Sequence, residues 1–407
     1  MANRIYFANQ QVAFRRDAET DGANYKVAHG VQSVAVTTTF NLEQAFELGQ
    51  LSIYENIEGV PDIEITASKV LDGYPLLYHL ATDEAEGHAG SPHGPDLAGR
   101  SNAKCLIALG IWPDTDNFAA GISVQQMEAS GMFPSSVSYN FPLEDNFSED
   151  ITLVGNDKGW RNGVTADAIG CATPPWGFTG ALGGFDGQDV PKASGVNYVA
   201  GSAASAATVS QEGGVNRREN LKFYSERYYD AGGADYTYLP TQIPGVDDSG
   251  WMNPKVQTDN AHLQSITIST DLGREELFEL GTRQPYARVV TFPVEVTCDI
   301  EVVSISGDLI NAFADGCGSS TAACTGVTDN LTPEAIRVVT CEGTAIYLGN
   351  QNKLASVSYG GGDAGGGNVT VTFSYSTFND FTVIHPQDPN ASGSGWWAAR
   401  STYLTDL

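Results

Sequence analysis

Apolar and polar residues alternate with a period of two in several short stretches of this chain. The alternation is clearest in SVAVTTTF (33–40) and SITIST (265–270), and it recurs in DIEIT (62–66) and PVEVTCDIEVVSI (293–305). A period of two places successive side chains on opposite faces of a strand, so each stretch is predicted to be a half-buried β-strand.

Two segments 232 residues apart share most of this pattern. VQSVAVTTTFNLEQAFELG (31–49) and LQSITISTDLGREELFELG (263–281) are identical at eight of nineteen positions without a gap, whereas chance predicts about one. Weaker likeness follows: 63–66 with 294–297 after a one-residue slip, 103–109 with 335–341, and 137–147 with 371–381. A period above 200 residues indicates a duplicated domain rather than a solenoid.

The repeat divides the chain into three parts. Residues 1–155 and 259–407 are predicted to be two tandem, mainly β domains, each a β-sandwich or partial barrel with one short helix, at PLLYHLA (75–81) and DLINAFAD (308–315). Residues 156–258 are interpreted as a connection with partial structure that carries the chain from one copy to the next.

Charge adds to this picture because the acidity belongs to the two repeats. The net charge of −28 divides into −14 for residues 1–155 (21 acids, 7 bases), −11 for residues 259–407 (17 acids, 6 bases) and −3 for residues 156–258 (11 acids, 8 bases). Such a field repels phosphate and argues against tight binding of nucleic acid. There is no apolar run of about 20 residues, the length that a membrane span needs, and no secretory signal at the N-terminus, so cytoplasmic synthesis is expected.

Candidate chemistry is sparse. The loop HLATDEAEGHAGSPHGPD (79–96) holds His79, His88 and His93 beside several acids, but it lacks HxH or HExxH spacing, and a solvated loop is the preferred interpretation over a metal site. There is no Gly-x-Ser-x-Gly elbow, and the glycine-rich 360–368 lacks the Gly-Lys-Ser/Thr of a phosphate loop. Cys317 and Cys324 are expected to be reduced in a cytoplasmic protein, although an oxidising compartment would allow a bridge. We therefore predict no enzyme, cofactor or metal.

Four stretches resemble one family. The paired FELG segments, VPDIEITASKVLDGYPLLYHL (60–80) and NKLASVSYGGGDAGGGNVTVTFSYSTFNDFTVI (352–384) are similar to tail tube proteins of tailed bacteriophages, over about 1–155 and 259–407. The resemblance implies β-sandwiches flanked by a helix, whose inner strands close into a barrel, in rings that stack around a lumen for the genome. Single-domain members form hexameric rings, and two-domain members form trimeric, pseudo-hexameric ones.

The resemblance also implies partners and a location. These are other copies in stacked rings, a tape-measure protein, a tail terminator and, where one is present, a sheath, all in a virion assembled in the host cytoplasm. DNA would pass through without being specifically bound.

Two sets of residues are predicted to carry the role. Strand parity turns Glu64 and Glu295 away from the sandwich core and toward the channel. The segments that end in FELG are predicted to contact neighbouring subunits through Phe46, Glu47, Gly49, Phe278, Glu279 and Gly281.

Three alternatives remain at this point. The first is another virion component, such as a terminator, a neck or baseplate ring, or a decoration protein. The second is a secreted β-rich adhesin. The third is a metal-dependent hydrolase that uses the histidines of 79–96.

Overall fold

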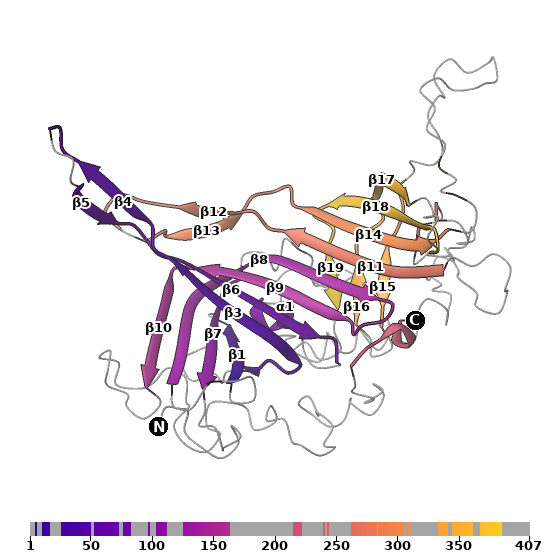
Figure 1. The fold of residues 1–407 in the computed structure, drawn as a ribbon, viewed down its shortest axis with the longest axis horizontal. Helices are drawn as coiled ribbons and strands as arrows, with labels where there is room; N and C mark the ends of the chain where they lie inside the picture. The colour runs from indigo at the N-terminus through magenta and orange to yellow at the C-terminus, as the bar shows by residue number, and fades with distance from the viewer. Residues whose placement is uncertain are drawn as a thin grey trace, which may run out of the picture.

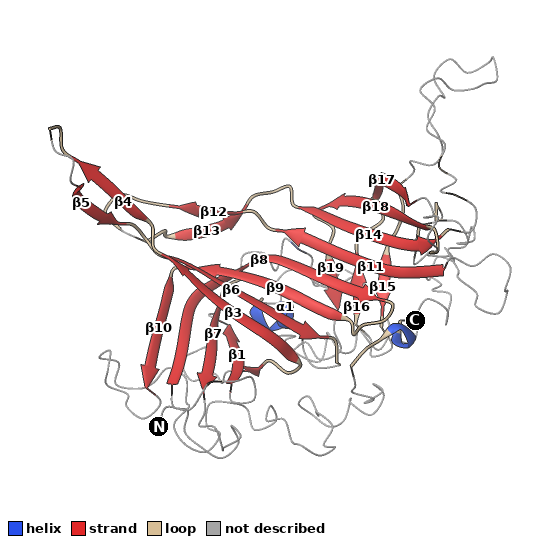
Figure 2. Ribbon diagram, in the orientation of Figure 1, coloured by secondary structure: helices blue, strands red, loops and turns tan. Residues whose placement is uncertain are grey.

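The computed structural model describes residues 5, 10–16, 26–49, 53–72, 76–82, 97, 103–111, 125–162, 215–221, 239–240, 242–243, 262–282, 284–304, 307, 310, 333–340, 344–360 and 367–384. Strands dominate this part of the chain, as predicted, with one short α-helix and one 3-10 turn (Figure 2). No described helix has the length and apolar character that a membrane span requires.

Eight antiparallel strands form the central feature, one curved sheet that runs through both halves of the chain (Figure 1). Their order is β3 (Val31–Thr39), β6 (Asp62–Val70), β9 (Ser148–Gly155), β8 (Gln125–Pro142), β11 (His262–Asp271), β14 (Glu295–Val303), β18 (Thr370–Phe378) and β17 (Lys353–Gly360). Because β8 pairs with β11, the two halves share one hydrogen-bonded sheet rather than two.

One face of this sheet is apolar and buried against a second layer of strands. In the first half the 18-residue β8 continues into that layer, where its beginning pairs with β7 (Cys105–Ile111) and β10 (Asp157–Asn162); β7 in turn pairs with β1 (Gln10–Arg16), and β1 with β2 (Lys26–Val27). In the second half the layer is β15 (Arg337–Val339), β16 (Ala345–Tyr347) and β19 (Thr382–Ile384). The buried α1 (Leu77–Ala81) completes the first half at the predicted place. Of the counterpart at 308–315, only residue 310 lies inside the described residues.

The two halves have the same strand order, β3-β6-β9-β8 and β11-β14-β18-β17. They also share an irregularity. The β3–β6 register shifts between Val31 and Ser33, and the β11–β14 register shifts between Leu263 and Ser265. A β-bulge is a conserved local feature of a fold, so its recurrence at the same place supports the repeat found in 31–49 and 263–281.

The same comparison shows that β17 corresponds to β8. Each strand has a register shift on its inner neighbour, at residue 135 in β8 and at residue 355 in β17, and SVSY follows in both, at 136–139 and 356–359. The sequence alignment of 137–147 with 371–381 was therefore wrong, because 371–381 lies in β18, which corresponds to β9.

The β6–β14 alignment also needs correction. The structure aligns β14 with β6 at an offset of 233 residues, so that Glu64 corresponds to Thr297 and Glu295 to Asp62. The sequence alignment used an offset of 231. The two offsets differ by two residues. Because side chains alternate between the faces of a strand with a period of two, this error leaves every residue on its correct face, and the alternation of apolar and polar residues does not reveal it.

The connecting segment 156–258 is partly described, and it touches both halves. Its first residues form β10, so the sheets of the first half extend beyond residue 155. Farther on, Asn216 donates its N–H to the carbonyl of Leu71 and accepts from the N–H of Phe147, and Leu221 bridges to Thr340 of the second half.

Candidate functional site

The outward face of the eight-stranded sheet, called the polar face below, carries small hydroxyl and acidic side chains. Every position is exposed or half-buried, while the residues between them are buried in the six inner strands and mostly half-buried or exposed in the edge strands β3 and β17. Apart from the ends of the strands, its members are Ser33, Ala35, Thr37, Thr39, Asp62, Glu64, Thr66, Ser68, Ser148, Asp150, Thr152, Val154, Ser136, Ser138, Asn140, Ser265, Thr267, Ser269, Asp271, Glu295, Thr297, Asp299, Glu301, Thr372, Ser374, Ser376, Ser356 and Ser358.

Glu64 and Glu295 both lie on this face, and both are exposed. Their strand neighbours Ile63, Ile65 and Val296 are 3%, 1% and 1% exposed, which is the parity that the sequence predicted. That these carboxylates line a channel stays a prediction at this point.

Uncharged hydroxyl and amide groups are the partners of several carboxylates on the polar face. Ser376 donates a hydrogen bond of 2.8 Å to Glu295, Ser265 one of 3.1 Å to Glu301, and Asn140 one of 3.0 Å to Asp150. The only cation at a position of this face within the described strands is Lys353, at the beginning of the edge strand β17. Arg288 pairs with Asp62 at the edge of the face, and no further Lys or Arg occupies a described position of the face to neutralise phosphate.

Two hairpins project beyond the sheet at one end (Figure 1). The first is β4 (Leu42–Phe46) with β5 (Ile53–Glu58), directly after β3, and the second is β12 (Arg274–Leu277) with β13 (Ala287–Val290), directly after β11. Since β3 and β11 run in the same direction in the sheet, both hairpins leave from the same end.

The FELG segments form the tips of these hairpins. Leu48 and Leu280 are fully exposed, and Phe46 and Phe278 are 66% and 57% exposed. Gly49 and Gly281 have φ angles of 93° and 98°, a conformation that explains why glycine recurs at this position. Apolar tips of this exposure are typical of surfaces that contact another protein, and the structure thus places the predicted contact residues, including Glu47 and Glu279, at two equivalent tips.

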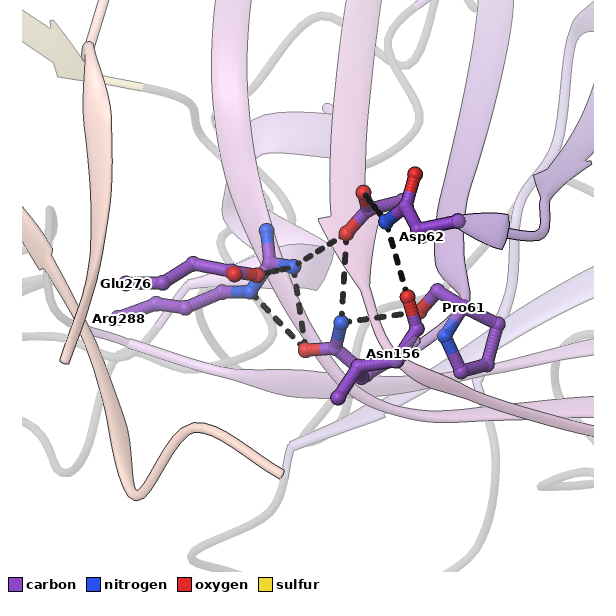
Figure 3. Close-up of polar contacts among 7 residues, drawn as sticks. Pro61, Asp62, Asn156, Glu276 and Arg288 are labelled. Carbon is purple, nitrogen blue, oxygen red and sulfur yellow. Dashed lines mark hydrogen bonds and ion pairs between the residues drawn. The ribbon is translucent and has the colours of Figure 1, made fainter. Parts of the chain in front are cut away.

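The base of the second hairpin is fixed to the first half of the chain by Arg288 (Figure 3). Its Nη2 lies 3.3 Å from Oδ1 of Asp62 and 3.1 Å from Oδ1 of Asn156, and it also pairs with Glu276 on the neighbouring strand. Asn156 in turn donates to the carbonyl of Pro61 at 3.0 Å. A guanidinium can serve several acceptors at once because its donors are fixed in one plane.

Arg274 makes a second contact of the same kind. Its Nε donates to the carbonyl of Pro134 at 2.8 Å, and its guanidinium lies 5.1 Å from the ring centre of Phe133. Burial, and to a smaller extent the positive charge of the nearby Arg288, lower the pKa of Arg274 to about 10, although Tyr78 opposes the shift. The two arginines therefore hold the second hairpin against the beginning of β6, the end of β9 and the middle of β8.

Replacing Arg288 by Ala should loosen this junction. The side chain is 8% exposed and its carboxylate partners are more exposed, so we expect a loss of about 2 kcal/mol in the free energy of unfolding. The matched control is Asn56→Ala at the equivalent place in the exposed first hairpin, for which less than about 0.5 kcal/mol is expected. Urea unfolding measures both, and equal losses would contradict a special role for Arg288.

Sequence reasoning missed two groups that organise this region. Arg288 gave no signal beyond being a base in an acidic domain. Glu149 lies fully buried opposite Lys69, where it accepts the N–H groups of Leu77 and Tyr78 at 2.6 and 3.0 Å and the hydroxyl of Tyr139 at 2.9 Å. It fixes the beginning of α1 to the sheet.

Of the three histidines in the predicted solvated loop, only His79 belongs to the described residues, and it does not lie in a solvated loop. His79 is buried in α1, with its Nε2 3.1 Å from the carbonyl of Val383. His88, His93, Cys317 and Cys324 lie outside the described residues. Within the described ranges there is no group of three or more side chains arranged to hold a metal ion.

Comparisons with known proteins find distant structural likeness only. The sequence matches no protein-family model and no curated protein sequence. Among solved structures, the chain is similar to the tube-terminating cap of the anti-feeding prophage, at 15% identity and a TM-score of 0.27, over 40% of this chain and 93% of that one.

Two further structures show similar values. A chain of the anti-feeding prophage baseplate gives 10% identity and a TM-score of 0.28 over 40% of this chain and 100% of that one. The sheath/tube terminator of the PVC extracellular contractile injection system in its extended state gives 14% and 0.27, over 39% and 98%.

Proposed function

We propose that the chain is a structural subunit of a phage-tail-like tube, in which it forms rings without catalysing a reaction. The carrying observation is the sheet itself, which consists of two halves of equal strand order and ends in two strands, β3 and β17, that each pair on one side only among the described residues. A sheet with two open edges exposes unpaired backbone groups, and closure with further copies removes them.

The closed arrangement is a ring because the two edges differ. If the β17 edge of one chain pairs with the β3 edge of the next, the contact is heterologous. Repeated heterologous contacts close into a cyclic assembly when the rotation per subunit allows it. With two modules per chain, three chains supply six modules around the axis, and we favour this trimeric ring over one of six chains.

The polar face then lines the lumen. Each phosphate held by Lys or Arg adds a contact that must break before the DNA can move. A lumen lined by hydroxyl and carboxylate groups, with Glu64 and Glu295 among them, lacks such contacts and would let DNA pass. The apolar face remains turned toward the second layer of strands, as in the isolated chain.

The two hairpin tips are proposed to contact the next ring. The tips carry the exposed side chains of Phe46, Leu48, Phe278 and Leu280. They lie at the same end of every subunit, so all of them would lie on one side of a ring. Burial of these side chains in the neighbouring ring would give stacking its apolar contribution, at about 25 cal/mol per Å² of buried apolar surface.

Electron microscopy of the purified chain tests this proposal. We expect rings with a central channel that stack into tubes of variable length at high protein concentration, with the polar face inside. Single rings that never stack would favour the alternative of a tail terminator or cap, whereas a monomer at every concentration, or rings with the polar face outside, would contradict the proposal.

A further inference from the structure

The junction between the two halves provides a template for the contact between two chains. Inside the chain, β8 pairs with β11 across seven residue pairs, from Ser265 opposite Pro142 to Asp271 opposite Ser136. By strand order, bulge position and sequence, β17 corresponds to β8, and β3 corresponds to β11. The sheet therefore ends in the two strand types that pair in its centre.

The side chains at the two ends lack the cover that their counterparts have. Tyr359 in β17 is 51% exposed, while its counterpart Tyr139 in β8 is fully buried. Phe40, which follows β3, is 68% exposed, while its counterpart Leu272 is 1% exposed and donates its N–H to the carbonyl of Ser135 in β8. Residues that the sequence repeats are thus buried at the internal junction and exposed at the ends.

We infer that β17 of one chain pairs antiparallel with β3 of a second copy in the register of β8 and β11. This inference rests on the proposed ring. Transfer of the internal register, in which Ser138 lies opposite Ser269 and Tyr139 opposite Ile268, places Ser358 opposite Thr37 and Tyr359 opposite Val36 of the next chain.

The two contacts differ in chemistry. At the internal junction Arg274 and Arg288 hold the second hairpin by ionic and polar contacts. The equivalent positions in the first hairpin are Leu42, which is 59% exposed, and Asn56. The contact between chains thus has no arginine on the hairpin side.

Apolar residues take the place of the polar contacts on the other side as well. Phe378, 56% exposed, occupies the position in the second half that Asn156 has in the first. Phe40, Leu42 and Phe378 are consequently expected at the chain–chain contact, beside Asn56 and Glu295, which is the counterpart of Asp62. The first hairpin supplies no arginine to pair with that carboxylate, so the contact depends less on ion pairs than the internal junction does. Ring closure is therefore expected to persist in salt concentrations that screen surface ion pairs.

Cysteine pairs test the register. The double variant Thr37→Cys with Ser358→Cys places two thiols on directly opposed positions, with Cβ atoms about 4.5–5.5 Å apart, and a disulfide is expected in assembled rings. The control pair Thr37→Cys with Ser356→Cys is shifted by two residues, about 7–8 Å apart, and should form at least about tenfold less cross-linked product. Each single variant controls for the natural cysteines, of which Cys105 and Cys298 are buried.

A second pair of variants tests the apolar contact. Phe40→Asp should prevent ring closure while the monomer keeps its far-ultraviolet circular dichroism spectrum, whereas Leu48→Asp at the hairpin tip should leave single rings intact. Different outcomes would contradict the β17–β3 contact and the ring itself. Rings that cross-link through the shifted pair, or that form equally well with Phe40→Asp, would overturn this contact and leave the ring standing, whereas absence of any assembly in the unaltered chain would overturn both.

Discussion

Replacing Ile268 by Asp is expected to lower the free energy of unfolding by about 4 kcal/mol, since an isolated carboxylate would be buried in the sheet. Ile268 is fully buried on β11, between Tyr139 of β8 and Cys298 of β14. Thermal or urea unfolding, followed by circular dichroism, measures the loss.

The matched variant is Val36→Asp, at the equivalent position of β3. Val36 is half-buried at the open edge of the sheet, so the isolated chain should lose only about 1 kcal/mol. Ring assembly should nevertheless be lost, because the proposed neighbour would bury the charge. If both variants destabilised the monomer equally, or if Val36→Asp still assembled, the difference between the internal and outer junctions would be refuted.

Replacing Glu149 by Ala is expected to cost about 3 kcal/mol, because two N–H groups at the beginning of α1 and the hydroxyl of Tyr139 lose their acceptor inside the protein. The exposed Glu64→Gln on the polar face is the control, with a change below about 0.5 kcal/mol. A loss as small as that of the control would show that solvent reaches this site.

Glu149 also predicts a pH dependence. Burial raises the pKa of its carboxyl above the ordinary value of 4.5, although the N–H groups of Tyr78 and Leu77, the Tyr139 hydroxyl and Lys69 oppose the shift. The folded chain therefore holds this proton more tightly than the unfolded chain. The contribution of the protonated carboxyl to the free energy of unfolding is complete below pH 4.5, the ordinary pKa, and is lost as the pH rises through the folded-state pKa.

Unfolding of the wild type and of Glu149→Gln across this range isolates the effect. The free energy of the wild type minus that of the variant should decrease as the pH rises above about 4.5. A difference that increases with pH would mean that the hydrogen bonds to the carboxylate outweigh its burial.

The sequence by itself determined the elements and their faces. Alternation with a period of two identified β3, β6, β11 and β14, and it placed Glu64 and Glu295 on the exposed face, because in an extended chain the pleat alone decides which way a side chain points. The FELG repeat marked two equivalent turns because a glycine with positive φ and an exposed leucine recur there. These features are local, so they can be read from the order of residues.

The tertiary structure alone decided which strands meet and in which register. A slip of two residues leaves every side chain on the same face of its strand, so the alternating pattern could not reveal that β6 and β14 were aligned two residues out of register. The alignment from sequence also matched β8 with β18, although the letters SVSY occur in both β8 and β17. The long β8 that joins the two halves, and the contact of Arg288 with Asp62 across 226 positions, depend on pairing between distant segments. Hydrogen bonds of a sheet form between backbones, which are alike in every strand, so the choice of partner emerges only when the whole apolar face is buried together.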